Sequence, residues 1–304
     1  MLSTDYNKTV DLLLEILPFA LKDERFALKG GTAINLFHRD FARLSVDIDL
    51  CYLPLESRDD TFKNIHSILE IIQKDLKEKL GLTVFPNKPL KDKNESKLFA
   101  RKDNLEVKIE PNYIIRGSIF QAEIIPLASK AQSKFKKSVD AKCLNLADTY
   151  GGKICAALDR QHPRDLFDVK NLLDNEGITE EVKNSFLFYL LSHGRPLDEL
   201  LNPKFKEIKK EYEDHFVGMA EQEPSVEELT NAREKLVNAV AESLSTSDKE
   251  FLVTFAKRSP DWSKFNIPGI EHYPSIKRKL YNQDQMTDEK VKEYVKKLSK
   301  VLGL

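Results

Sequence analysis

The sequence has few of the residues that mark disulfide-bonded, zinc-binding or membrane-spanning proteins. Its three cysteines, Cys51, Cys143 and Cys155, lie far apart and show no paired spacing, which excludes a zinc motif and indicates a reducing compartment. No apolar run reaches the length of a membrane span. Residues 1–21 indicate an amphipathic helix rather than a signal peptide. We therefore expect a soluble, cytoplasmic protein with no membrane partner.

The chain also lacks an excess of charge of either sign. Although 32% of its residues are charged, the formal net charge is only −1. No bulk basic character points to a nucleic-acid partner, so an RNA-binding surface would have to be a local patch. The 304 residues, 41% of them hydrophobic, suffice for one large or two ordinary domains with buried cores.

Glycine is scarce as well, with 11 in the chain, yet two stand side by side in FALKGGTAINLF, residues 26–37. This stretch predicts a short strand ending at Lys29, a tight turn at Gly30 and Gly31, and a helix capped by Thr32. Two adjacent glycines let a ligand approach the backbone, and the free N–H groups of a helix start suit phosphate. A glycine pair by itself more often marks an ordinary turn.

An acidic pair follows in SVDIDL, residues 45–50. The alternation predicts a half-buried strand with Asp47 and Asp49 on one face. Two carboxylates so close repel each other unless a cation lies between them, and their oxygens suit Mg²⁺, or Mn²⁺ in its place. Such a pair alone is often a solvated strand face. Beside an anion-binding turn, it indicates nucleotide chemistry.

These two motifs together resemble the signature of the nucleotidyltransferase superfamily related to DNA polymerase β. The longer stretches LKGGTAINL and RLSVDIDL resemble the AbiEii group, the toxins of AbiE-type (type IV) and MenT-type bacterial toxin–antitoxin systems. The resemblance is specific through Asp49 and continues more loosely to about Asp168. It implies Mg²⁺-dependent transfer of a nucleoside monophosphate from an NTP to an acceptor, a tRNA or another RNA, and restraint by a cognate antitoxin. The nucleotide-binding residues that it implies in this part of the chain are Lys29, Gly30, Gly31, Thr32, Arg43 and Ser45.

A third carboxylate is expected on a neighbouring strand. In LEVKIE, residues 105–110, apolar and charged residues alternate, so Glu106, Lys108 and Glu110 share one face. The resemblance implies that Glu110 is the third metal ligand or a general base, although these enzymes usually carry Asp there. A solvated strand face is the alternative, and Glu106 on the same face stays open as a candidate.

A second group of charged residues lies in the helices predicted from residue 146 to 160 and from residue 163 onward. Asp165 and Asp168, three positions apart, share one helix face, and surface salt bridges with the nearby cations are the simplest interpretation. The AbiEii-like pattern, a lysine followed by R…RDLxD, implies a site instead. In it, Lys153 reaches the triphosphate and a cluster completes the site: Arg160, Arg164, Asp165 and Asp168.

The predicted fold class is α+β. We expect a nucleotidyltransferase-like mixed sheet with helices over residues 1–140, and a mostly helical domain over 141–304 that completes the active site and contacts the acceptor. Strand signals end near residue 179, and the pattern then predicts helices at 182–191, 203–219, 226–244, 247–257 and 288–301. Two capping boxes are predicted, Ser225 with Glu228 and Ser247 with Glu250.

Two other functions remain open on the same fold. An antibiotic nucleotidyltransferase with an aminoglycoside acceptor would need an acidic acceptor cleft in place of a basic one. A catalytically idle nucleotide-binding protein would bind NTP and Mg²⁺ without transfer. The intact carboxylate pair argues against the idle protein.

Overall fold

The computed structural model describes residues 2–90 and 95–304. The sequence NKPLKDKNE, residues 87–95, predicts a polar loop, and part of it lies outside the described residues. The chain divides into two compact units. Unit 1 comprises Met1–Thr149 and Val217–Glu223, and unit 2 comprises Tyr150–Phe216 and Pro224–Leu304. No sequence signal marks the second segment of unit 1.

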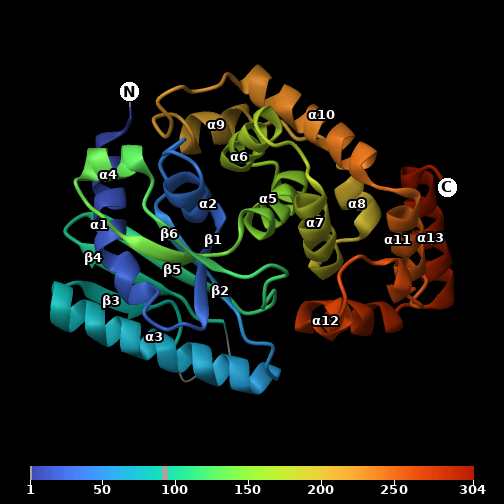
Figure 1. Ribbon diagram of the computed structural model, residues 1–304, viewed down its shortest axis with the longest axis horizontal. Coiled ribbons are helices and arrows are strands. Elements are labelled where there is room, and N and C mark those ends of the chain that lie inside the picture. Colours follow the sequence, from blue (N-terminus) through green and yellow to red (C-terminus); the bar gives the residue numbers. More distant parts are fainter. Residues whose placement is uncertain (1, 91–94) are drawn as a thin grey trace. The chain divides into compact units, whose positions relative to one another are not determined.

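A seven-stranded mixed sheet is the centre of unit 1 (Figure 1), with the strand order β3-β4-β5-β2-β1-β7-β6. The strands are β1 (Phe26–Lys29), β2 (Asp47–Tyr52), β3 (Thr83–Pro86), β4 (Leu98–Lys102), β5 (Leu105–Asn112), β6 (Glu123–Pro126) and β7 (Asp140–Cys143). Strand β2 is antiparallel to β1 and parallel to β5, and β1 is parallel to β7. The predicted mixed sheet is confirmed. Strand β7 was not predicted. The sequence of residues 118–127 predicts a longer strand than the observed β6.

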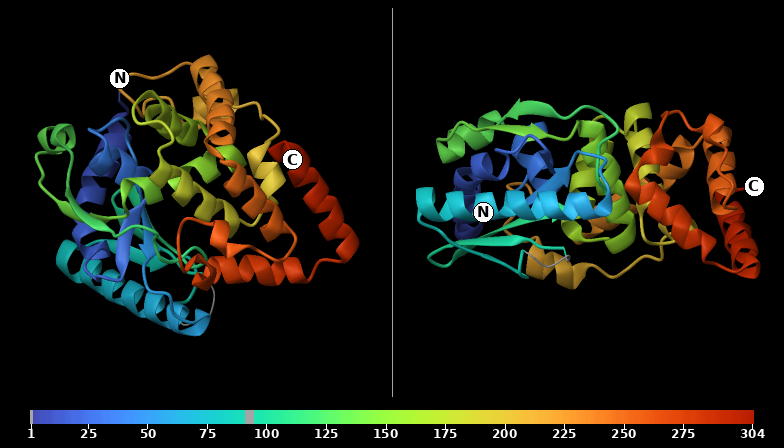
Figure 2. Two further views of the ribbon diagram at one scale, coloured as in Figure 1. Left: turned by 45° about the vertical axis from the view of Figure 1, so that its right-hand side comes forward. Right: turned by 90° about the horizontal axis from the view of Figure 1, so that it is seen from below.

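One face of the sheet packs under two long helices, α1 (Thr4–Ala20) and α3 (Arg58–Leu80). Helix α3 is a single unbroken helix in both views of Figure 2. Its ends follow local rules: Ser57 accepts a hydrogen bond from the backbone of Asp60, and Gly81 stops the helix at φ 65°. On the strands below, Ile48 and Leu50 are fully buried. The predicted alternation of β2 is therefore confirmed, with its charged residues on the opposite face.

The short helical segments of unit 1 are α2 (Gly30–Ala33), the π-helical turn η1 (Ile34–His38) and α4 (Ser129–Phe135). Gly30 has φ 72°, and the chain makes the predicted tight turn at Gly30 and Gly31, within the first residues of α2, directly after β1. The prediction that Thr32 caps this helix is wrong, because Thr32 lies inside α2 and its hydroxyl bonds elsewhere. Helix α4 was not predicted.

Regular structure in the described part of unit 2 is entirely helical. The chain passes into unit 2 within α5 (Leu146–Arg160) and continues through α6 (Pro163–Asp174), α7 (Glu180–Ser192), α8 (Leu197–Leu201), α9 (Lys209–His215), α10 (Val226–Ser243), α11 (Thr246–Ala256), η2 (Trp262–Lys264), η3 (Ile270–His272), α12 (Pro274–Asp284) and α13 (Asp288–Leu302). None of the helices among the described residues has both the length and the apolar character needed to cross a bilayer.

The helices of unit 2 differ from the sequence prediction at four places. The helix predicted at 203–219 is present but shorter, because the chain stays irregular until α9 begins at Lys209 and the helix ends at His215. Helices α8 and α12 were not predicted. The capping box of α10, with Ser225 and Glu228, is confirmed. The box of α11 instead pairs Ser245 with Asp248, because Asp248 carries the third-position carboxylate for a serine cap two residues earlier than expected.

Candidate functional site

The charged face of the sheet carries the predicted carboxylates in neighbouring rows. Asp47 on β2 lies opposite Lys108 on β5, and Asp49 lies opposite Glu110. On the other side of β2, Lys29 of β1 is the partner of Asp49. The side chains of Asp47 and Glu110 are 34% and 39% exposed. The three predicted carboxylates therefore share one accessible face of adjacent strands.

Lys108 lies among these carboxylates and was not singled out from the sequence. Its Nζ is 2.7 Å from Glu110 Oε2 and 3.9 Å from Asp47 Oδ1. Burial alone would lower the pKa of Lys108, but the hydrogen bond to Glu110 and the charge of Asp47 raise it overall. Burial likewise opposes ionisation of Glu110, yet its bond with Lys108 leaves the pKa lowered. Both groups are charged at neutral pH.

The donor set suits a hard divalent cation at Asp47 and Asp49, where two carboxylates project from consecutive outward positions of one strand. Glu110 differs, because Lys97 and Lys108 are within 3.3 and 2.7 Å of its two oxygens. Over residues 2–90 and 95–304, no three His, Cys, Asp or Glu side chains gather closely enough to hold a metal. The carboxylate of Glu110 is therefore held by two lysines, and its role as a third metal ligand stays a prediction.

The glycine turn lies directly against the second aspartate. A Cβ added to Gly30 would be only 2.6 Å from Asp49 Oδ2. At Gly31, a Cβ would be 2.8 Å from Arg43 Nη2 and 3.0 Å from Ser45 Oγ. A side chain at either position would therefore displace the ends of these side chains, and at Gly30 the positive φ of 72° favours glycine as well.

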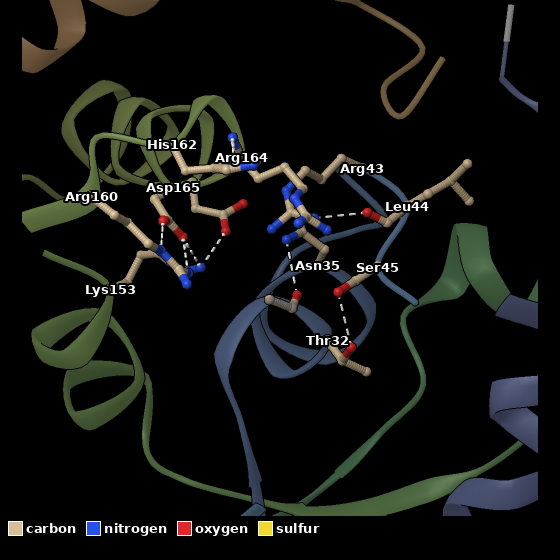
Figure 3. A network of polar contacts seen from close by, with 12 residues as sticks. Thr32, Asn35, Arg43, Leu44, Ser45, Lys153, Arg160, His162, Arg164 and Asp165 are labelled. Atoms are coloured by element: carbon tan, nitrogen blue, oxygen red, sulfur yellow. Dashed lines mark hydrogen bonds and ion pairs between the residues drawn. The ribbon is translucent and has the colours of Figure 1, made fainter. Parts of the chain in front are cut away.

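Three buried polar side chains hold this turn (Figure 3). Thr32 Oγ1 lies 3.0 Å from Ser45 Oγ and 2.5 Å from the backbone oxygen of Asp47. Arg43 donates to Leu44 O at 2.8 Å. Because Thr32, Arg43 and Ser45 are at most 7% exposed, they position the turn. Of the predicted phosphate-binding residues here, Lys29 and Gly30 are the more accessible.

Replacing Gly30 with alanine tests this close approach. The new Cβ would meet Asp49 and hold a strained positive φ, so we expect a loss of about 1–2 kcal/mol of stability and a large loss of transfer activity. Thermal unfolding and a transfer assay measure the two effects. Gly81→Ala is the matched control, because Gly81 also has a positive φ but no atom within 4 Å of the added Cβ. Equal activity losses in both variants would contradict a role for the Gly30–Asp49 contact.

The second predicted group forms a buried ion cluster within unit 2. Lys153 of α5 has its Nζ 2.8 Å from Asp165 Oδ1 and 3.0 Å from Asp168 Oδ2, both on α6. The three side chains are 6%, 1% and 0% exposed. The charge of Lys153 is thus already matched by two buried carboxylates, which differs from the surface salt bridges considered from the sequence.

Arg160 joins this cluster from its exposed side. Its guanidinium donates to both oxygens of Asp165, one bond measuring 3.0 Å, while 63% of the side chain remains exposed (Figure 3). Burial alone would raise the pKa of Asp165, but the charges of Lys153 and Arg160 outweigh it and hold the pKa well below its usual range. The carboxylate is therefore ionised at every physiological pH.

Two further residues support this cluster, and neither was among the predicted site residues. His162 caps α6, its Nδ1 accepting from the backbone of Arg164 at 3.2 Å (Figure 3). Burial and the charge of Arg164 lower the pKa of His162 to about 4, so the ring is neutral. A Cβ at Gly151 would lie 2.6 Å from the backbone of Ser185, so this glycine lets α5 pack closely on α7.

The predicted site residues therefore fall into two groups. Unit 1 holds Lys29, Gly30, Gly31, Thr32, Arg43, Ser45, Asp47, Asp49 and Glu110, and unit 2 holds Lys153, Arg160, Arg164, Asp165 and Asp168. Within each unit, the structure brings most of the predicted group together. The roles of the individual residues remain predictions.

The chain was compared with curated protein sequences, solved structures and protein families. No curated protein sequence matches the chain significantly. Among solved structures, MenT4, a nucleotidyltransferase toxin from Mycobacterium tuberculosis H37Rv, has a TM-score of 0.61 over 91% of this chain and 93% of that chain, at 13% identity. At that identity the likeness shows the fold alone, and it confirms the predicted fold class. The family described as nucleotidyl transferase AbiEii toxin, type IV TA system, matches residues 11–244. The chain therefore belongs to the AbiEii family of nucleotidyltransferase toxins of type IV toxin–antitoxin systems.

Proposed function

We propose that the protein transfers a nucleoside monophosphate from an NTP to a tRNA with Mg²⁺ or Mn²⁺, in the cytoplasm, and is restrained by a cognate antitoxin. The observation that carries this proposal is the placement of Asp47 and Asp49 on one accessible face of β2, with Gly30 against Asp49. A carboxylate pair beside a tight backbone turn suits a metal-bound triphosphate.

In this proposal Asp47 and Asp49 hold the divalent cation, which when bound neutralises the triphosphate and the departing pyrophosphate. Lys29 and the backbone at Gly30 bind phosphate oxygens. Glu110 has a lowered pKa beside Lys108, so it is a weak base. We therefore assign it to orient the acceptor hydroxyl by a hydrogen bond rather than to remove the proton.

The cluster of unit 2 has a supporting part in the same proposal. Lys153 is buried between two carboxylates, so we assign it to hold Asp165 in place. Asp165 in turn fixes the guanidinium of Arg160, whose largely exposed side chain suits contact with phosphate. On this assignment, residues 1–140 supply the transfer chemistry and the helical residues 141–304 bind phosphate and acceptor.

Incubating the protein with each labelled NTP, Mg²⁺ and total tRNA tests the function. We expect one NTP to label tRNA, and tRNA affinity to fall steeply as salt rises, since binding through phosphates releases counterions. Binding of NTP and Mg²⁺ without transfer to any acceptor would identify a catalytically idle protein. Transfer to an aminoglycoside but not to tRNA, with a flat salt dependence, would overturn the acceptor assignment.

A further inference from the structure

The accessible face of the sheet continues from the carboxylates onto two strands with no assigned role. Phe85 of β3 lies opposite Phe99 of β4, Phe99 lies opposite Lys108 of β5, and Lys108 lies opposite Asp47. These four side chains therefore form one row across four neighbouring strands. With strands about 4.8 Å apart, the row spans about 14 Å.

The two rings of this row are stacked on each other and flanked by cations. Their centroids are 5.6 Å apart at an interplanar angle of 19°. Arg101 lies over the Phe85 ring at 4.6 Å, and Lys97 lies 5.9 Å from the centre of Phe99. Arg101 also donates to Glu106 on β5, which fixes its guanidinium. We refer to Phe85, Phe99, Lys97 and Arg101 as the aromatic platform.

The platform lies on the solvent side of the sheet. Both rings are half-buried, whereas Val84 and Ala100, which point to the opposite face of the same strands, are 2% and 0% exposed. Large apolar rings kept partly in water beside cations are the features of sites that stack nucleobases and hold the phosphates between them.

We propose that the aromatic platform binds an unpaired segment of the RNA acceptor and presents it to Asp47 and Asp49. This inference rests on the proposed function and adds a second acceptor contact, on β3 and β4, to the one proposed for residues 141–304. Aromatic stacking of unpaired bases is the usual way in which proteins bind single-stranded RNA. Lys97 and Arg101, which pair with Glu110 and Glu106 in the free protein, supply the charge complementary to its phosphates.

The order of the strands separates this segment from the NTP. Lys29 and Gly30, assigned to the triphosphate, lie on the β1 side of the Asp47–Asp49 strand, and the platform lies on its β5 side. The carboxylates are thus between the two. Donor phosphate and acceptor hydroxyl approach from opposite sides, as in-line displacement requires.

A double variant of the full-length protein, Phe85→Leu with Phe99→Leu, tests the platform, since leucine keeps the apolar bulk but loses stacking. We expect the Kd for a short single-stranded oligoribonucleotide, measured by fluorescence anisotropy, to rise at least about tenfold. The KM for tRNA should rise similarly, with the KM for NTP unchanged. Phe19→Leu is the matched control, because Phe19 is also half-buried on unit 1 with Lys79 over its ring at 5.7 Å.

The outcomes separate this proposal from the proposed function. Unchanged oligonucleotide binding in an active double variant would overturn the platform and leave the transferase assignment standing. A raised KM for NTP alone would also overturn it, by identifying the NTP base as the occupant. If thermal unfolding shows that the double variant does not fold, Arg101→Gln, a substitution at an exposed side chain, tests the platform instead. It is expected to weaken oligonucleotide binding, and unchanged binding would overturn the proposal. Absence of any RNA transfer by the wild type would refute the proposed function itself.

Discussion

Replacing Asp49 with asparagine is expected to abolish nucleotide transfer while leaving the fold intact. Asp49 projects from β2 beside Gly30 and opposite Glu110, and the variant loses half of the charge assigned to the divalent cation. A loss of several kcal/mol of transition-state stabilisation corresponds to roughly a thousandfold in rate or more. Relief of the repulsion between two neighbouring carboxylates should keep the melting temperature equal or raise it. Transfer of labelled NTP and thermal unfolding measure these two effects.

Asp40→Asn is the matched control for this variant. Asp40 is an exposed acid of unit 1 that pairs with Lys130, so we expect its neutralisation to leave transfer unchanged. Wild-type rates for Asp49→Asn, with Mg²⁺ as the only metal, would refute the assignment of the carboxylate pair.

The second large effect is expected on stability, in Lys153→Met. Methionine fills the space of the lysine stem but leaves the carboxylates of Asp165 and Asp168 buried without the ammonium between them. Breaking a buried ion pair in this way costs about 3–5 kcal/mol, which lowers the melting temperature by about 10 °C in a protein of this size. Lys170→Met is the control, because Lys170 makes a more exposed pair with Asp174 on the same helix, and its loss should cost under about 1 kcal/mol.

The pH dependence of Lys153→Met distinguishes a broken charge cluster from a packing defect. In the wild type the pKa of Asp165 is depressed, so its contribution to stability is complete above the unfolded pKa of about 3.9 and is lost only in stronger acid. Without Lys153, burial raises the pKa of at least one carboxyl, and the folded variant gains stability as pH falls. The difference in melting temperature should therefore narrow between pH 7 and pH 5. A constant difference would indicate a packing defect.

Local chemistry explains which parts of the fold were predictable. Helix α3 carries its own start and stop, Ser57 and Gly81, and β2 shows its alternation over a few residues. Strand β7 has four residues, DAKC, and forms only by pairing with β1 and β6. A segment so short shows no period of its own, so its pairing cannot be read from sequence. Helix α12 is strongly polar, and the prolines and glycine of residues 258–274 indicate a loop up to its start at Pro274.

The same distinction between local pattern and distant contacts explains which residues of the candidate site could be predicted. Asp47 and Asp49 were recognisable because a strand period fixes which side chains share a face. The burial of Lys153 could not be recognised from the sequence, since a lysine among arginines and aspartates is typical of a surface. Its environment results from the close packing of α5, which depends on a contact between Gly151 and Ser185 over 30 positions away. Lys108 shares the face of Glu110 in the sequence pattern, but its bridge to Asp47 depends on the β2–β5 register.

The contact between Gly30 and Asp49 also limits how this family can diverge. Gly30 is the first residue of α2 and directly follows Lys29, the β1 partner of Asp49, and a methyl group added to it would lie 2.6 Å from Asp49 Oδ2, so a side chain at position 30 would displace the Asp49 carboxylate. In a related chain, a side chain at the glycine position is expected to be accompanied by a smaller or uncharged residue at the aspartate. Such a paired change would identify a homologue that retains the fold but has lost the transfer activity.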